Sequence, residues 1–90
     1  MSQVAKSLID TNAAFYSLKF LGSLLMHLQF TRDAISIFTT MRDLGYELLN
    51  WSYVLQAFQC LAVSFQKAQQ YQEAVIAYKK MLQLAWVTNS

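Results

Sequence analysis

The order of hydrophobic and polar residues predicts two amphipathic helices in the second half of the chain. The first apolar face consists of Phe58, Leu61, Ala62 and Phe65. The second begins after the polar run 66–70 and consists of Ala74, Tyr78, Met81 and Leu82. Spacings of three and four residues place each set on one side of a helix. Two such helices joined by a short polar break predict a helical hairpin.

The same pattern occurs once earlier, forty positions upstream. Residues paired by this shift agree in size class or in charge. The pairs are Leu61/Leu21, Ala62/Gly22, Phe65/Leu25, Gln69/Gln29, Glu73/Asp33, Ala74/Ala34, Tyr78/Phe38, Met81/Met41 and Leu84/Leu44. A shared register of this length predicts two copies of one hairpin. The small residues in the register predict a close approach of the two helices in each copy.

The repeated residues resemble the signature of the tetratricopeptide repeat (TPR), in which a large apolar residue precedes Leu-Gly, an aromatic residue, Ala and Phe. The first copy matches with Leu18, Leu21, Gly22, Leu25, Ala34 and Phe38, and the second with Phe58, Leu61, Ala62, Phe65, Ala74 and Tyr78. The stretch Tyr71-Gln72-Glu73-Ala74 is similar to the family's start of its second helix. The resemblance covers roughly residues 15–86, which is nearly the whole chain.

Several features depart from the family pattern. The period is forty residues rather than the family's usual 34, so we expect an elongated helix or connector around Gly45–Trp51. Tyr46 and Trp86 occupy the positions of the family's closing proline. Gln29 and Gln69 stand where the family often has glycine.

The expected fold is all-α, with two tandem helical hairpins. The resemblance implies a TPR-like fragment of an α-solenoid with right-handed superhelical stacking. We expect one domain over residues 1–90, with a first hairpin at 12–45 and a second at 50–87. The expected helices are 13–29, 32–44, 51–68 and 72–86. The inward face of the first helix is expected to consist of Ala14, Leu18, Leu21 or Gly22, Leu25 and Leu28.

Capping residues predict where the helices begin and end. The expected N-caps are one of Asp10, Thr11 and Asn12 for the first helix, Thr31 for the second and Asn50 for the third. Gly45 fits the left-handed residue that ends the second helix. Residues 2–10 are expected to form a turn or two of helix, the end of a preceding repeat, or a frayed tail. Residues 88–90 are polar and are expected to be loose.

The apolar content is high for so short a chain. Of the 90 residues, 56% are hydrophobic and only 13% are charged. Two hairpins cannot enclose that much apolar surface, and repeat arrays normally need about three or more units with polar caps. We therefore expect the apolar flanks to be covered by a symmetry mate, a larger subunit or further repeats.

Charge and cysteine content exclude several classes of partner and setting. The formal net charge is +2 and the charges are scattered, whereas a nucleic-acid surface needs clustered Lys and Arg. One cysteine allows no internal disulfide and favours a reducing, cytoplasmic setting. Residues 1–10 do not resemble a secretion signal. The apolar stretch 13–30 is interrupted by Lys19, His27 and Gln29, so we expect no membrane span.

An enzyme is not expected. The chain has one His and one Cys, too few for a transition-metal site, and its two glycines do not form a phosphate-binding loop. His27 and Cys60 are the only base and nucleophile that could pair. The register places them about seven residues out of step along parallel helices, too far apart for a hydrogen bond. No metal and no cofactor is expected.

Binding of another protein is the expected activity. In the family, the first helix of each hairpin lines a concave groove that holds a peptide or helix of a partner. The corresponding positions are Tyr16, Lys19, Phe20, Ser23, His27, Gln56, Gln59, Cys60, Val63 and Lys67. These residues also lie off the apolar faces and mix aromatic rings with amide and ammonium donors, which suits recognition of an extended or helical segment. The alternative for Phe20, Cys60 and Val63 is packing against neighbouring repeats.

Two functions follow from this pattern. The first is a non-catalytic adaptor or scaffold module that serves as a subunit or fragment of a larger assembly. The alternative is a structural module that forms a homodimer through its apolar ends. The family's clamp for acidic chaperone tails is incomplete here, because Ser23 and Cys60 stand where it has Asn and only Lys19 matches.

Overall fold

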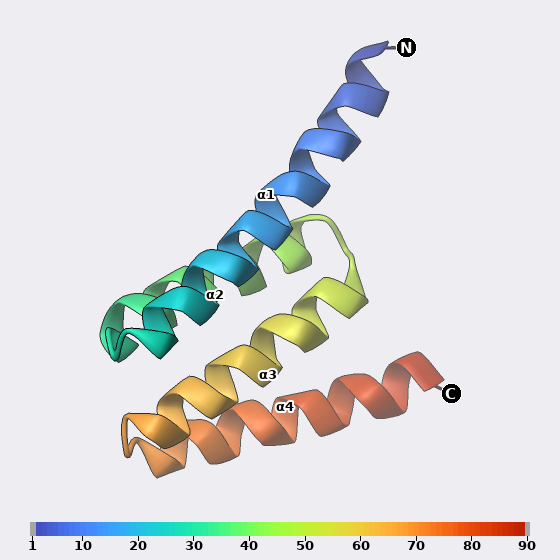
Figure 1. Cartoon of the computed structure of the whole chain (residues 1–90). Coiled ribbons are helices and arrows are strands. Elements are labelled where there is room, and N and C mark those ends of the chain that lie inside the picture. Colours follow the sequence, from blue (N-terminus) through green and yellow to red (C-terminus); the bar gives the residue numbers. More distant parts are fainter. Residues whose placement is uncertain (1, 90) are drawn as a thin grey trace.

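The computed structural model describes the backbone of residues 2–89 and the side chains of residues 10–87. Its four helices are α1 (Ser2–His27), α2 (Thr31–Glu47), α3 (Trp51–Lys67) and α4 (Tyr71–Asn89). Each helix packs against the next, and α1 also lies beside α3 (Figure 1). No strand occurs within residues 2–89. The expected all-α arrangement of helical hairpins is confirmed.

The core lies along the contacts between successive helices. Its buried side chains are Phe15, Ala34, Phe38, Met41, Val54, Ala57, Phe58, Leu61, Ala62 and Ala77. Four of these are alanines, which let the helix axes approach closely. Met41 of α2 and Phe58 of α3 are among the larger buried side chains of this core.

The inward face predicted for α1 is only partly correct. Gly22 is buried, and Leu18 and Leu25 are half-buried, as predicted. The other predicted members, Ala14, Leu21 and Leu28, are exposed. The buried position is instead Phe15, whose ring stacks on Tyr53 of α3 with 3.7 Å between centroids. Compared with the prediction, the buried side of α1 is therefore turned so that it contacts α3 as well as α2.

Three turns of the same kind connect the helices. Gln29, Leu49 and Gln69 have positive φ angles of 71°, 52° and 63° and recur at twenty-residue intervals. In the first turn, the N–H of Phe30 donates to the Leu25 carbonyl at 2.8 Å, and the N–H of Gln29 donates to that of Met26. These bonds, repeated at each turn, define a Schellman motif. The forty-residue period is therefore two units of one helix and one turn.

These turns correct one prediction about the end of α2 and decide between two alternatives for another. Gly45 is not the left-handed stop, because it lies inside α2 with an ordinary φ and Leu49 takes that conformation. Of the two alternatives for the longer period, an elongated helix or an elongated connector, the structure shows the helix, because the connector after α2 has the same length as the other two. The additional residues extend the helix to Glu47.

The predicted caps meet different outcomes. Asn50 caps α3, and its side chain accepts a hydrogen bond from the Tyr53 N–H at 3.1 Å. Thr31 does not cap α2, because the Schellman turn places Phe30 at the N-cap without a side-chain bond.

At the two ends of the chain the helices run further than predicted. Asp10, Thr11 and Asn12 lie inside α1, which begins at Ser2 because nothing in residues 2–12 breaks a helix. Asn12 instead accepts a hydrogen bond from the Tyr53 hydroxyl. Residues 88 and 89 belong to α4 rather than to a loose end, and Ser90 lies outside the described residues.

Both glycines mark close approaches between helices. A Cβ at Gly22 would lie 2.4 Å from Cε1 of Phe38, so this glycine lets α2 pack directly on α1. A Cβ at Gly45 would lie 2.9 Å from the backbone nitrogen of Val54, so this glycine does the same between α2 and α3. Each glycine therefore sets one interhelical distance.

The apolar stretch 13–30 is divided between α1 and the turn that follows it. No helix within residues 2–89 combines the length and the apolar character that crossing a membrane requires.

Candidate functional site

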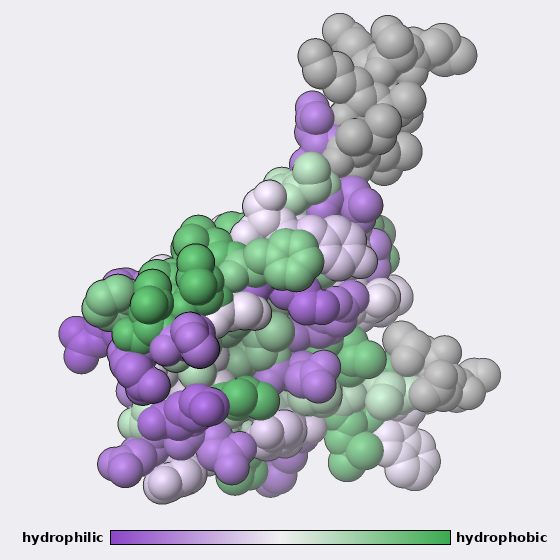
Figure 2. Space-filling model, in the orientation of Figure 1, coloured by the Kyte–Doolittle hydropathy of each residue, from purple (hydrophilic) through white to green (hydrophobic). Residues whose placement is uncertain are grey.

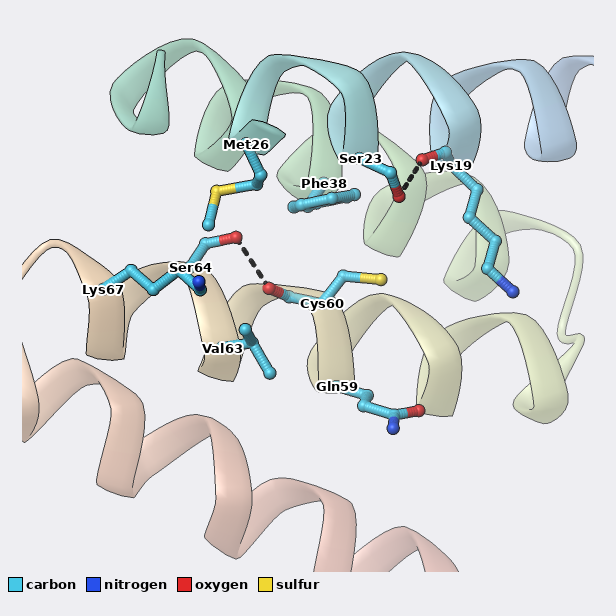
Figure 3. Close-up of a pocket in the computed structure, with 9 residues that line it drawn as sticks. All are labelled: Lys19, Ser23, Met26, Phe38, Gln59, Cys60, Val63, Ser64 and Lys67. Atoms are coloured by element: carbon cyan, nitrogen blue, oxygen red, sulfur yellow. Dashed lines mark hydrogen bonds between the residues drawn. The ribbon is translucent and has the colours of Figure 1, made fainter. Parts of the chain in front are cut away.

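A hollow of about 400 Å³ lies between α1 and α3, and we call it the α1–α3 groove. Figure 3 shows its lining, which comes from α1, α2 and α3. The residues are Lys19, Ser23, Met26, Phe38, Gln59, Cys60, Val63, Ser64 and Lys67. Apolar side chains form most of the middle of the groove, and the two lysines lie at opposite ends in this view.

Six of the ten predicted binding residues meet in this groove. They are Lys19, Ser23, Gln59, Cys60, Val63 and Lys67. They come from two helices that are not adjacent in sequence, which the repeat register anticipated. Apart from the adjacent pair Gln59 and Cys60, their spacing along each helix is three or four residues, so they follow one side of α1 and one side of α3.

The other four predicted residues lie outside the lining. Gln56 is half-buried and accepts a hydrogen bond from Lys19 Nζ at 2.8 Å, so it positions a lining residue. Tyr16 packs edge-on against the stacked pair of Phe15 and Tyr53. Phe20 and His27 are exposed and do not contribute to the groove.

Three lining residues were not predicted. Met26 and Ser64 continue the helical spacing of the lysine-bearing faces, at 19, 23, 26 and 60, 64, 67. This spacing alone could have identified them. Phe38 comes from α2 and closes the base of the groove between α1 and α3, so only the packed structure reveals it.

The two lining hydroxyls are already used within their own helices. Ser23 Oγ donates to the Lys19 carbonyl, and Ser64 Oγ donates to the Cys60 carbonyl, each at 2.8 Å. The groups left for a ligand are therefore the ammonium groups, the Gln59 amide and the Cys60 thiol. No carboxylate is present among the described residues that line the groove.

Lys19 lies at one end of the groove, where it contacts uncharged groups. Its Nζ bonds the neutral Gln56 amide and lies 6.0 Å from the centroid of the Tyr16 ring. The ion pair within residues 10–87 joins Arg42 and Asp43 on α2, and neither residue lines the groove. The positive charge of Lys19 therefore remains available to a carboxylate.

Cys60 is a half-buried free thiol on the α3 wall. Burial raises the pKa of this thiol because the thiolate loses solvation, and the nearby charge of Lys19 lowers it in part. At neutral pH the side chain is therefore a protonated, weakly polar group. It suits contact with a ligand better than nucleophilic attack.

We expect alkylation of Cys60 by iodoacetamide to follow a pH profile shifted above that of the urea-unfolded chain. Lys19→Gln should move the profile to still higher pH, because it removes the one charge that favours the thiolate. Lys67→Gln is the matched control and should leave the profile in place. Identical profiles for the native protein and Lys19→Gln would contradict this account of the groove.

The groove does not bring together the His and Cys side chains that the sequence offers for chemistry. Within the described residues, no group of three or more His, Cys, Asp and Glu side chains could hold a metal ion. His27 is exposed and separate from the lining that contains Cys60. What the groove offers is two positive charges beside an apolar surface.

Comparison of the chain with protein-family models, with curated proteins and with solved structures finds no match. The resemblance to the tetratricopeptide repeat therefore stays a prediction that rests on the repeated residues.

Proposed function

We propose that this chain is a non-catalytic, TPR-like adaptor that binds a short segment of another protein in the α1–α3 groove. The observation that carries the proposal is the pair Lys19 and Lys67, which lie at the two ends of a mainly apolar hollow. Two ammonium groups separated by apolar side chains fit a segment in which carboxylates flank an apolar residue.

The size and position of the groove favour a segment over a whole folded surface. Its volume of about 400 Å³ lies at the lower end of the range for small-ligand sites, so it holds a few side chains. It is open and follows two roughly parallel helices, so a chain can enter and leave at its ends. A free thiol in its wall fits a reducing, cytoplasmic setting.

The experiment is a selection from a random-peptide display library on the intact chain. We expect enrichment of Asp or Glu on both sides of an apolar residue. An enriched peptide, labelled with fluorescein, should then bind the double variant Lys19→Glu/Lys67→Glu at least tenfold more weakly by fluorescence anisotropy. Each solvent-accessible charge contact contributes about 0.2–1 kcal/mol. Reversing both charges also replaces attraction with repulsion, which brings the total to about 1.4 kcal/mol or more, the equivalent of tenfold.

The matched control is Lys79→Glu/Lys80→Glu, which makes the same change in net charge on exposed positions of α4. This variant should bind like the native chain, apart from a small salt-dependent loss. If both double variants weaken peptide binding equally, the loss comes from the change in net charge. That result would refute the groove as the binding site.

A further inference from the structure

The interface between α2 and α3 uses one defined face of each helix. From α3, Val54, Ala57, Leu61 and Ser64 are all buried. From α2, Ile35, Phe38, Arg42 and Tyr46 lie on one side of the helix by their spacing. Phe38 on this side also packs on Gly22 of α1. Tyr46 packs edge-on against Trp51 and Phe58, and the Arg42 guanidinium lies over the Phe58 ring at 6.0 Å.

On α4, the residues forty positions after this α2 face are all exposed. They are Val75, Tyr78, Leu82 and Trp86, and we call them the α4 face. Phe38 is 2% exposed, whereas its equivalent Tyr78 is 42% exposed. The smallest member of the α2–α3 contact, Gly45, corresponds to Ala85, which keeps a small residue where the helices approach most closely.

On α1, the residues forty positions before the α3 face are also exposed. They are Ala14, Ser17, Leu21 and Leu24, and we call them the α1 face. Leu61 is 2% exposed, whereas its equivalent Leu21 is 46% exposed. Figure 2 shows the apolar side chains gathered over this part of α1.

We infer that the α4 face of one molecule docks on the α1 face of a second copy and repeats the α2–α3 interface between chains. The α4 face corresponds to the α2 side of the internal α2–α3 interface, and the α1 face corresponds to its α3 side. The two faces belong to the last and the first helix of the chain. The α4 face is more apolar than its counterpart on α2, since Leu82 replaces Arg42. The α1 face is about as apolar as its counterpart on α3, since Leu24 replaces Ser64 while Ser17 replaces Ala57. Burying the two faces against each other is therefore favoured by the hydrophobic effect.

This contact joins two different faces and leaves one of each open at the ends of the stack. Such a heterologous interface produces a head-to-tail series rather than a closed dimer. At each junction, α3 of one molecule would lie near α1 of the next. This repeats the arrangement in which α1 lies beside α3 within one chain. The α1–α3 groove would continue across the junction, although the inference does not depend on what the groove binds.

The test uses one blocked variant for each face, studied by sedimentation velocity over a range of concentrations. We expect the native chain to form concentration-dependent species larger than a dimer. Leu82→Glu on α4 and Leu24→Glu on α1 should each be monomeric, because each keeps only one working face. An equimolar mixture of the two variants should form a dimer and nothing larger, because only one junction can form.

Matched controls place the same charge on other sides of the same helices. Gln83→Glu on α4 and His27→Glu on α1 should assemble like the native chain, because both positions are exposed and belong neither to the two faces nor to the groove lining. Trp86→Glu and Leu21→Glu provide a second blocked pair, and circular dichroism checks the helical content of every variant. Because all four blocked positions are exposed, the variants should fold.

Three results would overturn the inference. The first is a native chain that stays monomeric at every concentration. The second is a Leu24→Glu variant that still dimerises alone, which would show pairing of two α4 faces. The third is a Leu82→Glu variant that does so, which would show pairing of two α1 faces.

Discussion

Gly22→Leu should lower the free energy of unfolding by about 1–3 kcal/mol, the usual range for overpacking a tight core. The first added carbon alone would lie 2.4 Å from Cε1 of Phe38. This ring is buried among core side chains, so it cannot turn away without displacing them. The helices α1 and α2 would have to separate.

Thermal unfolding followed by circular dichroism measures the effect of Gly22→Leu. Each kcal/mol should lower Tm by about 4–8 °C in a domain of this size. Ala13→Leu is the control, because it places the same leucine side chain at an exposed position of α1 and should change stability by less than about 0.5 kcal/mol. A Gly22→Leu protein that melts with the native chain would be incompatible with the packing of Phe38 on α1.

The hairpins could be predicted because the spacing of large and small residues along each helix determines how the helices pack. A large side chain on one helix needs a small residue opposite it, and both recur after forty positions. Gly22 against Phe38 shows this contact directly. Its second-repeat equivalents, Ala62 and Tyr78, were found from the same register.

The helix ends could not be predicted in the same way, because packing decides them rather than local preference. Gln29, Leu49 and Gln69 adopt a left-handed conformation that glycine normally supplies. The sequence predicts such an end at Gly45, but it is the close approach to Val54 that requires this residue to lack a side chain. The position of each turn follows from the lengths over which neighbouring helices pack.

The groove was partly predictable for a related reason. Helical spacing assigns residues to a side of α1 or α3, which was enough to bring together Lys19 and Lys67. It does not fix the rotation of α1, which depends on Phe15 stacking on Tyr53 of α3. Phe20 and His27 therefore lie outside the groove, although their spacing had included them.

The triple variant Gln29→Gly/Leu49→Gly/Gln69→Gly should raise the free energy of unfolding by about 1.5–3 kcal/mol. A residue with a Cβ loses about 1–2 kcal/mol in the left-handed conformation. Glycine avoids that loss but makes the unfolded chain more flexible, at about 0.4–1 kcal/mol. The net gain is about 0.5–1 kcal/mol at each turn, and the gains should add because the three turns are separate sites.

The matched control moves each glycine one residue earlier, to Leu28, Leu48 and Ala68. Leu48 and Ala68 have φ angles of −87° and −80°, which any residue adopts. Glycine at these positions relieves nothing and should destabilise each turn by about 0.5–1 kcal/mol. Chemical denaturation of both triple variants should therefore shift the midpoint in opposite directions. Shifts of the same sign would contradict the left-handed geometry at Gln29, Leu49 and Gln69, and with it the twenty-residue unit from which the repeat is built.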